Sequence, residues 1–160
     1  MIRSGTGRPA ELFFDDITVG MTFDLGVVEV DRDEMLTFAR RFDPQWYHVD
    51  VDAARSSPYG DVIASGFYTA SLFMRAYTDN LLSRAAADAS PGLEELRWTA
   101  PVYAGDRLRI TLDVLDATSS TTKPNVGTLT LAATMTRLAN DVRPEAVASR
   151  IRFRGWFFRR

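Results

Sequence analysis

The sequence predicts a single α+β domain in which an antiparallel sheet wraps around one long buried helix. Residues 63–82 are apolar on nearly all sides at helical spacing, as expected of a helix surrounded by protein. After Pro91 and Gly92 the apolar period changes from 3.6 to 2 residues, which indicates strands. Because these strands follow the helices and do not alternate with them, repeated βαβ units are not expected.

Composition limits the function classes. The chain has 160 residues, of which 46% are hydrophobic, enough for one domain with a real core. A formal net charge of -2 provides no long-range field that attracts nucleic acid. The chain has no cysteine and one histidine, which excludes disulfides and leaves a zinc site short of ligands. With no signal peptide and no run of roughly 18 apolar residues, we expect a cytoplasmic protein that binds neither membrane nor nucleic acid.

The first elements are a leader and a strand. Residues 1–11 contain two glycines, one proline and few apolar residues, so we expect a flexible leader. The domain then comprises residues 12–160. Within it, residues 21–30 end in Val-Val-Glu-Val and are expected to form a strand.

Helices are predicted next. Asp31 can cap a helix, with Glu34 three residues later as in a capping box. Apolar residues then recur at helical spacing until Pro44, which ends this helix one or two residues earlier. A short helix is expected near residues 51–55, and the long apolar helix over residues 63–82 follows.

Four strands are predicted after the long helix, over residues 93–100, 107–114, 127–138 and 147–158. In the second of them apolar and polar residues alternate strictly, as in a strand with one buried face. Proline, glycine and asparagine residues mark the turns between the strands.

His48 is the only histidine, and Asp43 lies five residues before it. An imidazole, with an unperturbed pKa of about 6.5, exchanges protons near neutrality more readily than any other side chain in this sequence. The turn broken by Pro44 can direct both side chains toward one pocket, where together they could hold a water. Asp-Pro pairs also open ordinary turns, and a lone histidine is often structural. Spacing alone leaves both interpretations open.

Gly66 lies at the start of the long helix, where backbone N–H groups lack partners and the helix dipole is positive. Such donors stabilise negative charge that develops on a carbonyl oxygen. The alternative is that Gly66 only permits a tight turn or close packing. Four large residues, Trp46, Phe67, Met74 and Tyr77, are candidates for the walls of a pocket.

Two other features have ordinary explanations. Gly105 and Asp106 suit a hairpin turn. The five arginines between Arg150 and Arg160 can bind phosphates, but their alternation along a strand is more typical of a solvent-exposed face. No Gly-rich phosphate-binding or dinucleotide-binding motif follows a strand.

Three blocks occur in a specific order and spacing: residues 38–50 (FARRFDPQWYHVD), 63–69 (IASGFYT) and 101–106 (PVYAGD). Together they resemble the MaoC-like dehydratases, the family that includes R-specific enoyl-CoA hydratases. The resemblance extends from about Phe14 to Phe157. Gln45 and Trp46 stand where the family most often has Asn-Pro, and Met74 stands where some members have a hydroxyl residue.

The resemblance implies a hot-dog fold, homodimerisation through the sheet and a tunnel for the pantetheine arm of an acyl thioester. It implies that Asp43 and His48 are the catalytic pair and that the N–H of Gly66 binds the thioester oxygen. The implied reaction is hydration of a 2-enoyl thioester, or the reverse dehydration, with His48 as the base toward water and Asp43 as the partner in proton delivery.

The implied chemistry needs no metal or redox cofactor. CoA is the expected carrier of the substrate, and an acyl carrier protein is the alternative carrier. Two other functions remain open at this point, a hot-dog acyl-CoA thioesterase and a non-catalytic partner subunit that binds acyl-CoA.

Overall fold

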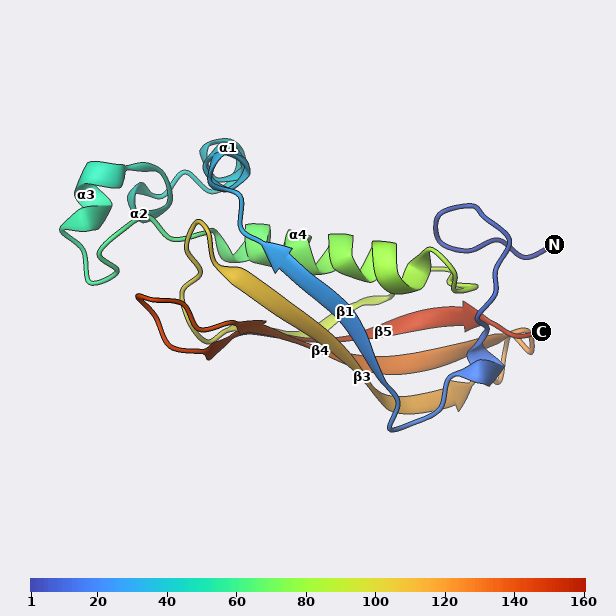
Figure 1. Ribbon diagram of the computed structural model, residues 1–160. Helices are drawn as coiled ribbons and strands as arrows, with labels where there is room; N and C mark the ends of the chain where they lie inside the picture. Colours follow the sequence, from blue (N-terminus) through green and yellow to red (C-terminus); the bar gives the residue numbers. More distant parts are fainter.

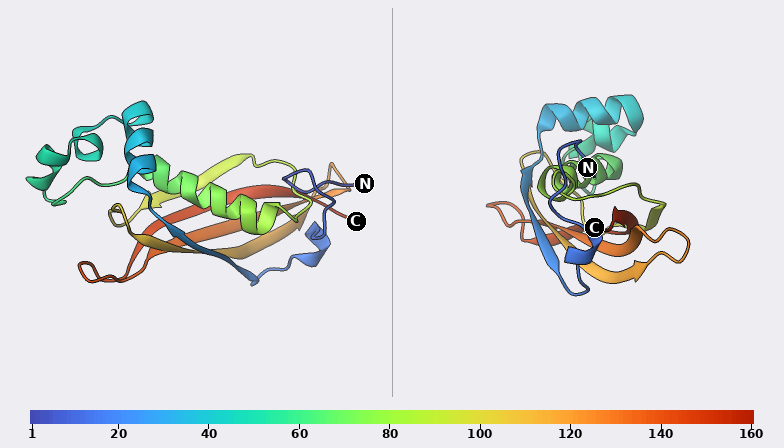
Figure 2. Two further views of the ribbon diagram at one scale, coloured as in Figure 1. Left: turned by 45° about the horizontal axis from the view of Figure 1, so that its top comes forward. Right: turned by 90° about the vertical axis from the view of Figure 1, so that its right-hand side faces the viewer.

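A curved five-stranded sheet and a helix that crosses one of its faces form the body of the molecule (Figure 1). The computed structural model describes residues 1–160. Seen end-on, the sheet curls beneath the central helix (Figure 2). The N- and C-termini lie together at one end, and the short helices lie at the other.

The helices and strands follow the predicted order. The first half of the chain contains η1 (Phe14–Asp16), β1 (Thr22–Glu29), α1 (Arg32–Phe42), α2 (Trp46–Val49), α3 (Val51–Arg55) and α4 (Gly66–Tyr77), which continues into the π-helical turn η2 (Thr78–Leu82). The second half contains β2 (Gly92–Trp98), β3 (Arg107–Ser119), β4 (Val126–Arg137) and β5 (Ala146–Phe158). None of the helices combines the length and the apolar character that a membrane span requires.

The sheet has the strand order β1-β3-β4-β5-β2, and every neighbouring pair is antiparallel. The predicted α+β class with one antiparallel sheet is therefore confirmed. The alternation predicted for β3 is also present, because Leu108, Ile110 and Leu112 are fully buried on the helix side.

Helix α4 packs one of its faces on the sheet. Phe73 and Tyr77 stack on each other, and both rings contact Phe153 of β5 edge-on. The opposite face is open, since Phe67 is 60% exposed and Met74 is 47% exposed. The expectation that protein surrounds this helix on all sides is wrong for a single chain, because the sheet wraps only one side of it.

The start of α1 is capped as predicted, but the capping box is incomplete. Asp31 Oδ1 accepts a hydrogen bond of 2.8 Å from the backbone N–H of Glu34. The Glu34 carboxylate does not return to the cap; it accepts a 2.9 Å hydrogen bond from the hydroxyl of Tyr68. This bond ties α1 to α4 and so helps to orient the turn that follows α1.

The segment 1–11, expected as a flexible leader, folds back on the end of η2. The N–H of Gly5 donates to the carbonyl of Leu82, and the N–H of Glu11 donates to the carbonyl of Arg84, both at 2.9 Å. Within the segment, Arg3 and Pro9 form an isolated β-bridge. Most of its residues are exposed, and the flexibility of the segment stays a prediction.

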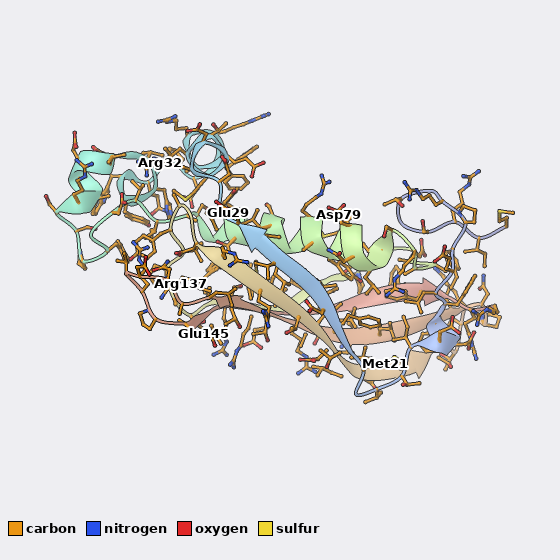
Figure 3. The ribbon with its side chains drawn as sticks, viewed as in Figure 1. Met21, Glu29, Arg32, Asp79, Arg137 and Glu145 are labelled. Carbon is orange, nitrogen blue, oxygen red and sulfur yellow. The ribbon has the colours of Figure 1, made fainter.

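The far end of the sheet supports the functional site. Figure 3 shows Arg137 and Glu145 at this end, below α2 and α3. Arg137 is buried, and its Nη1 donates a 2.6 Å hydrogen bond to the carbonyl of Pro101 in the loop between β2 and β3. The end of β4 thereby anchors the loop that carries the third sequence block.

The cap of α1 can be tested by Asp31→Ala. We expect this change to lower the free energy of unfolding by about 1 kcal/mol, because the N–H of Glu34 loses its acceptor. Asp33→Ala is the matched control, since it removes a first-turn carboxylate that makes no cap hydrogen bond. Urea unfolding that gives equal losses for both variants would contradict the capping role.

Candidate active site

Backbone hydrogen bonds bring the three sequence blocks side by side. The N–H of Ile63 donates to the carbonyl of Tyr47 at 3.1 Å, and the N–H of Ala64 donates to that of Val102 at 2.8 Å. The segment before α4 therefore lies between the turn after α1 and the loop after β2. Residues far apart in the sequence meet here.

His48 is buried on α2 and is held in one orientation. Its Nδ1 lies 2.7 Å from the carbonyl oxygen of Ile63. Because a carbonyl oxygen only accepts, Nδ1 is the donor in this hydrogen bond. Nε2 then faces Asp43, with 3.3 Å between Nε2 and Oδ2. The ring is thus positioned to accept a proton on the side of the carboxylate.

Asp43 ends α1 and receives neutral donors at both oxygens. The hydroxyl of Ser65 donates to Oδ2 at 2.7 Å, and the side-chain amide of Gln45 donates to Oδ1 at 2.8 Å. The Gln45 oxygen in turn accepts from the hydroxyl of Tyr47. The Ser65 hydroxyl is the main cause that lowers the pKa of Asp43; Gln45 and the charge of His48 act in the same direction, while partial burial opposes them. Asp43 is therefore a carboxylate at neutral pH.

Gly66 is the first residue of α4, and Trp98 covers it. The indole Nε1 of Trp98 donates a 2.9 Å hydrogen bond to the carbonyl of Gly66. A Cβ atom on residue 66 would lie 2.2 Å from the indole ring, so only glycine fits beneath it without movement. The N–H groups of Gly66 and Phe67 have no partner within the protein, which leaves them free for an acceptor.

These groups border one cavity of about 1090 Å³. Asp43, His48 and Gly66 line it together with other polar residues, among them Ser71 and Thr99, and hydrophobic side chains form most of its wall. Phe67 and Met74 line the cavity as predicted and are largely exposed, so the cavity is open on that side. Its size suits an elongated, mostly apolar molecule with a polar end.

Two residues predicted beside the pocket lie elsewhere. Trp46 is 50% exposed and packs against Tyr47 outside the cavity. Tyr77 is buried in the core against Phe73 and Phe153, because its position on α4 faces the sheet. Helical spacing alone could not separate the face of α4 toward the cavity from the face toward the sheet.

Gly105 and Asp106 do not form a hairpin, because β2 and β3 are not neighbours in the sheet. Buried Asp106 instead accepts a 2.8 Å hydrogen bond from the N–H of Tyr103, and Arg143 lies 3.7 Å from its other oxygen. This acid therefore holds the loop that carries the third block. The connection is a crossover from one edge strand to the interior of the sheet.

The C-terminal arginines are engaged with carboxylates. Arg152 and Arg154 both pair with Glu94, at 2.9 and 2.6 Å. Arg159 and Arg160 pair with two acids of η1 at 2.6 Å. These pairs agree with a solvated, charge-balanced face and offer no cluster directed at the cavity.

Sequence reasoning missed Ser65 and Trp98. Ser65 directly precedes Gly66, and a serine at a helix start is ordinarily a capping residue. Nothing in the sequence therefore indicates its hydrogen bond to Asp43. Trp98 ends β2 and meets Gly66 only through the crossing of α4 over the sheet.

The close contact of Gly66 and Trp98 can be tested by stability. Gly66→Ala should lower the free energy of unfolding by about 1–3 kcal/mol, because the new methyl group overlaps the indole. In a Trp98→Ala background the same change should cost clearly less. Thermal unfolding of the four proteins measures the coupling, and equal losses in both backgrounds would show that the contact is unimportant.

Comparisons with known proteins identify the family of this chain. The family description "MaoC like domain" matches residues 16–137. The 3-hydroxyacyl-thioester dehydratase Z of Mycobacterium tuberculosis is 34% identical over 106 residues, which cover 63% of this chain and 70% of the relative. A crystal structure of a MaoC-like dehydratase from Rhodospirillum rubrum is 33% identical, has a TM-score of 0.83 and covers 94% of this chain and 99% of its own.

The (R)-hydratase from A. caviae has a TM-score of 0.66 and 21% identity, and the match covers 87% of this chain and 96% of the hydratase. That likeness concerns the fold alone, which is the hot-dog fold expected from the sequence. The match to the family description covers most of the chain and includes all three sequence blocks. The chain belongs to the MaoC-like domain family.

Proposed function

We propose that this protein is an acyl-thioester hydratase or dehydratase. It would add water across the 2,3 bond of a 2-enoyl thioester or remove water from the 3-hydroxyacyl thioester. The observation that carries the proposal is the pair of Asp43 and His48, 3.3 Å apart on the wall of a cavity that also presents the free N–H of Gly66. CoA is the proposed carrier, with an acyl carrier protein as its alternative.

The orientation of His48 supports its role as the base. Nδ1 donates a hydrogen bond to the carbonyl of Ile63, so in the proposed mechanism Nε2 is the nitrogen that accepts a proton from a water between Nε2 and Asp43 Oδ2. In hydration, the water oxygen bonds to C3 of the substrate while its proton moves to Nε2. The electron pair of the 2,3 bond shifts toward the thioester oxygen, which becomes enolate-like.

The remaining step returns one proton to the α carbon. Asp43 is a carboxylate at neutral pH and therefore has no proton of its own to give. The proton taken from water, shared between Nε2 and Oδ2, is the one that reaches the α carbon, and the two groups act as a coupled pair. The N–H of Gly66 stabilises the charged oxygen until then. No atoms beyond substrate and water are needed.

A named relative supports this chemistry. The mycobacterial relative is a 3-hydroxyacyl-thioester dehydratase by name, which describes removal of water from an acyl thioester. A cytoplasmic location and the lack of a metal or redox cofactor stay predictions.

The dyad can be tested with a panel of 2-enoyl-CoA substrates by the absorbance of the enoyl-thioester band. Asp43→Asn and His48→Gln should each lower the hydration rate by at least roughly 100-fold, because each removes half of the proton-transfer pair. Asp50→Asn is the control, since Asp50 caps α3 outside the cavity and asparagine caps equally well.

A thiol reagent separates the alternatives in the same assay. Release of free thiol at the rate of band loss would indicate a thioesterase. A wild-type protein that binds acyl-CoA without turning over any substrate would indicate a non-catalytic partner subunit. Unchanged rates in both dyad variants would refute the assignment of Asp43 and His48.

We also propose that the protein is a homodimer whose second copy covers the open side of the cavity. Phe67 and Met74 on α4 and Trp98 on β2 are between 47% and 60% exposed and lie around the same opening. Adjacent apolar side chains of this kind are typical of an interface rather than of a free surface.

Light scattering of the purified protein should give about twice the 17.9 kDa chain mass. Met74→Glu should shift the equilibrium toward the monomer, because it places a charge in the apolar interface. Met21→Glu is the control, since Met21 is 38% exposed, directly precedes β1 (Figure 3) and does not line the cavity. A monomeric wild type at micromolar concentration would contradict the proposal.

A further inference from the structure

Ser65 occupies the N-cap position of α4 but does not cap the helix. A serine at this position ordinarily accepts a hydrogen bond from the N–H two or three residues later. Here the backbone has the extended conformation of an N-cap, with φ -56° and ψ 138°, and yet its hydroxyl makes no cap hydrogen bond. The hydroxyl donates instead to Asp43 Oδ2 at 2.7 Å.

This arrangement has two consequences at the same place. The Asp43 carboxylate is held from both sides, by Ser65 at Oδ2 and by Gln45 at Oδ1, so that Oδ2 stays directed at His48 Nε2. The first N–H groups of α4 keep no partner within the protein, because the side chain that would have satisfied one of them points elsewhere.

The surroundings of Ser65 restrict the direction of its hydrogen bond to Asp43. Ser65 is fully buried, and its neighbour Ala64 is fixed by the hydrogen bond to Val102. Ile63, two residues before it, accepts the Nδ1 proton of His48. The same short segment therefore orients both members of the dyad, His48 through a backbone carbonyl and Asp43 through a side chain.

We propose that Ser65 is a positioning residue of the active site, which fixes Asp43 against His48 and leaves the helix amides free for the substrate oxygen. The inference rests on the proposed function of this site. It extends that function because the geometry of Asp43 and the free N–H of Gly66 would both depend on Ser65, a side chain that contacts neither the water nor the substrate. Loss of the hydroxyl should then affect turnover more than binding.

The kinetic test compares Ser65→Ala and Ser65→Gly with the wild type. Both should lower kcat roughly 10- to 100-fold while KM changes less than about 3-fold, because Asp43 loses its fixed position. Ser65→Gly matters because glycine is nearly as good an N-cap as serine, so this variant keeps the helix start. Ser65→Thr retains the hydroxyl and should recover most of kcat.

Ser83→Ala is the matched control. The Ser83 hydroxyl also makes one hydrogen bond, a 2.8 Å bond to the carbonyl of Asp79 at the far end of the helix. It lies outside the cavity, so kcat should stay at the wild-type value. Ser65→Gly with kcat within about 3-fold of wild type would overturn the inference.

A second readout does not depend on activity. Because the Ser65 hydroxyl lowers the pKa of Asp43 in the folded protein, their bond stabilises the fold above the unfolded-state pKa of about 3.9 and the stabilisation is lost as the pH falls through the folded-state pKa. His48 of α2 is the titratable group that faces Asp43, while Ser65 before α4 and Gln45 of the turn face it as neutral donors. Because His48 is present in both the wild type and Ser65→Ala, its own titration does not distinguish the two proteins.

The melting temperature of Ser65→Ala should therefore lie below that of the wild type at pH 7, and the gap should narrow toward pH 3. A hydroxyl that acted only on the helix would produce a gap independent of pH. A constant gap would overturn the inference even if the wild type hydrates no enoyl thioester, whereas such inactivity by itself would refute only the proposed function.

Discussion

Hydrogen bonds to the three residues before α4 form the junction on which the site depends. Ile63 donates to α2 and accepts from His48. Ala64 donates to the loop after β2, and Ser65 donates to Asp43. The helix that follows is fixed by its packing on the sheet. The positions of Asp43 and His48 are therefore fixed relative to the core of the domain, although Asp43 follows α1 and His48 lies on α2, at the edge of the molecule.

The electrostatics of the site follow from this junction. Asp43 is stabilised as a carboxylate mainly by the neutral hydroxyl of Ser65, with the Gln45 amide acting in the same direction. The Gln45 amide also donates to the Asp43 carboxylate and helps to lower its pKa. Gln45 stands where the family most often has asparagine, and its longer side chain reaches Asp43 Oδ1 while Tyr47 holds its oxygen. The departure in sequence is compatible with an ordered carboxylate.

The sequence predicted the elements well because their signals are local. The Asp31 cap and the alternation in β3 each depend on residues a few positions apart. It failed where a contact joins distant segments. Glu34 bonds to Tyr68 and leaves the capping box open, and Tyr77 faces the sheet and not the cavity. The role of Asp43 and His48 came from resemblance, since their spacing alone fits an ordinary turn equally well.

Hydrophobic side chains form most of the cavity wall, and polar side chains lie among them, which limits the molecules it can accept. Asp43, His48 and Gly66 present a fixed carboxylate, a base and free amides, whereas Phe67 and Met74 present hydrocarbon and a thioether. Met74 presents a thioether to the cavity, where a hydroxyl side chain could form a hydrogen bond. A polar group that lost its water beside Met74 would find no hydrogen-bonding replacement in that side chain, so this part of the wall favours apolar groups.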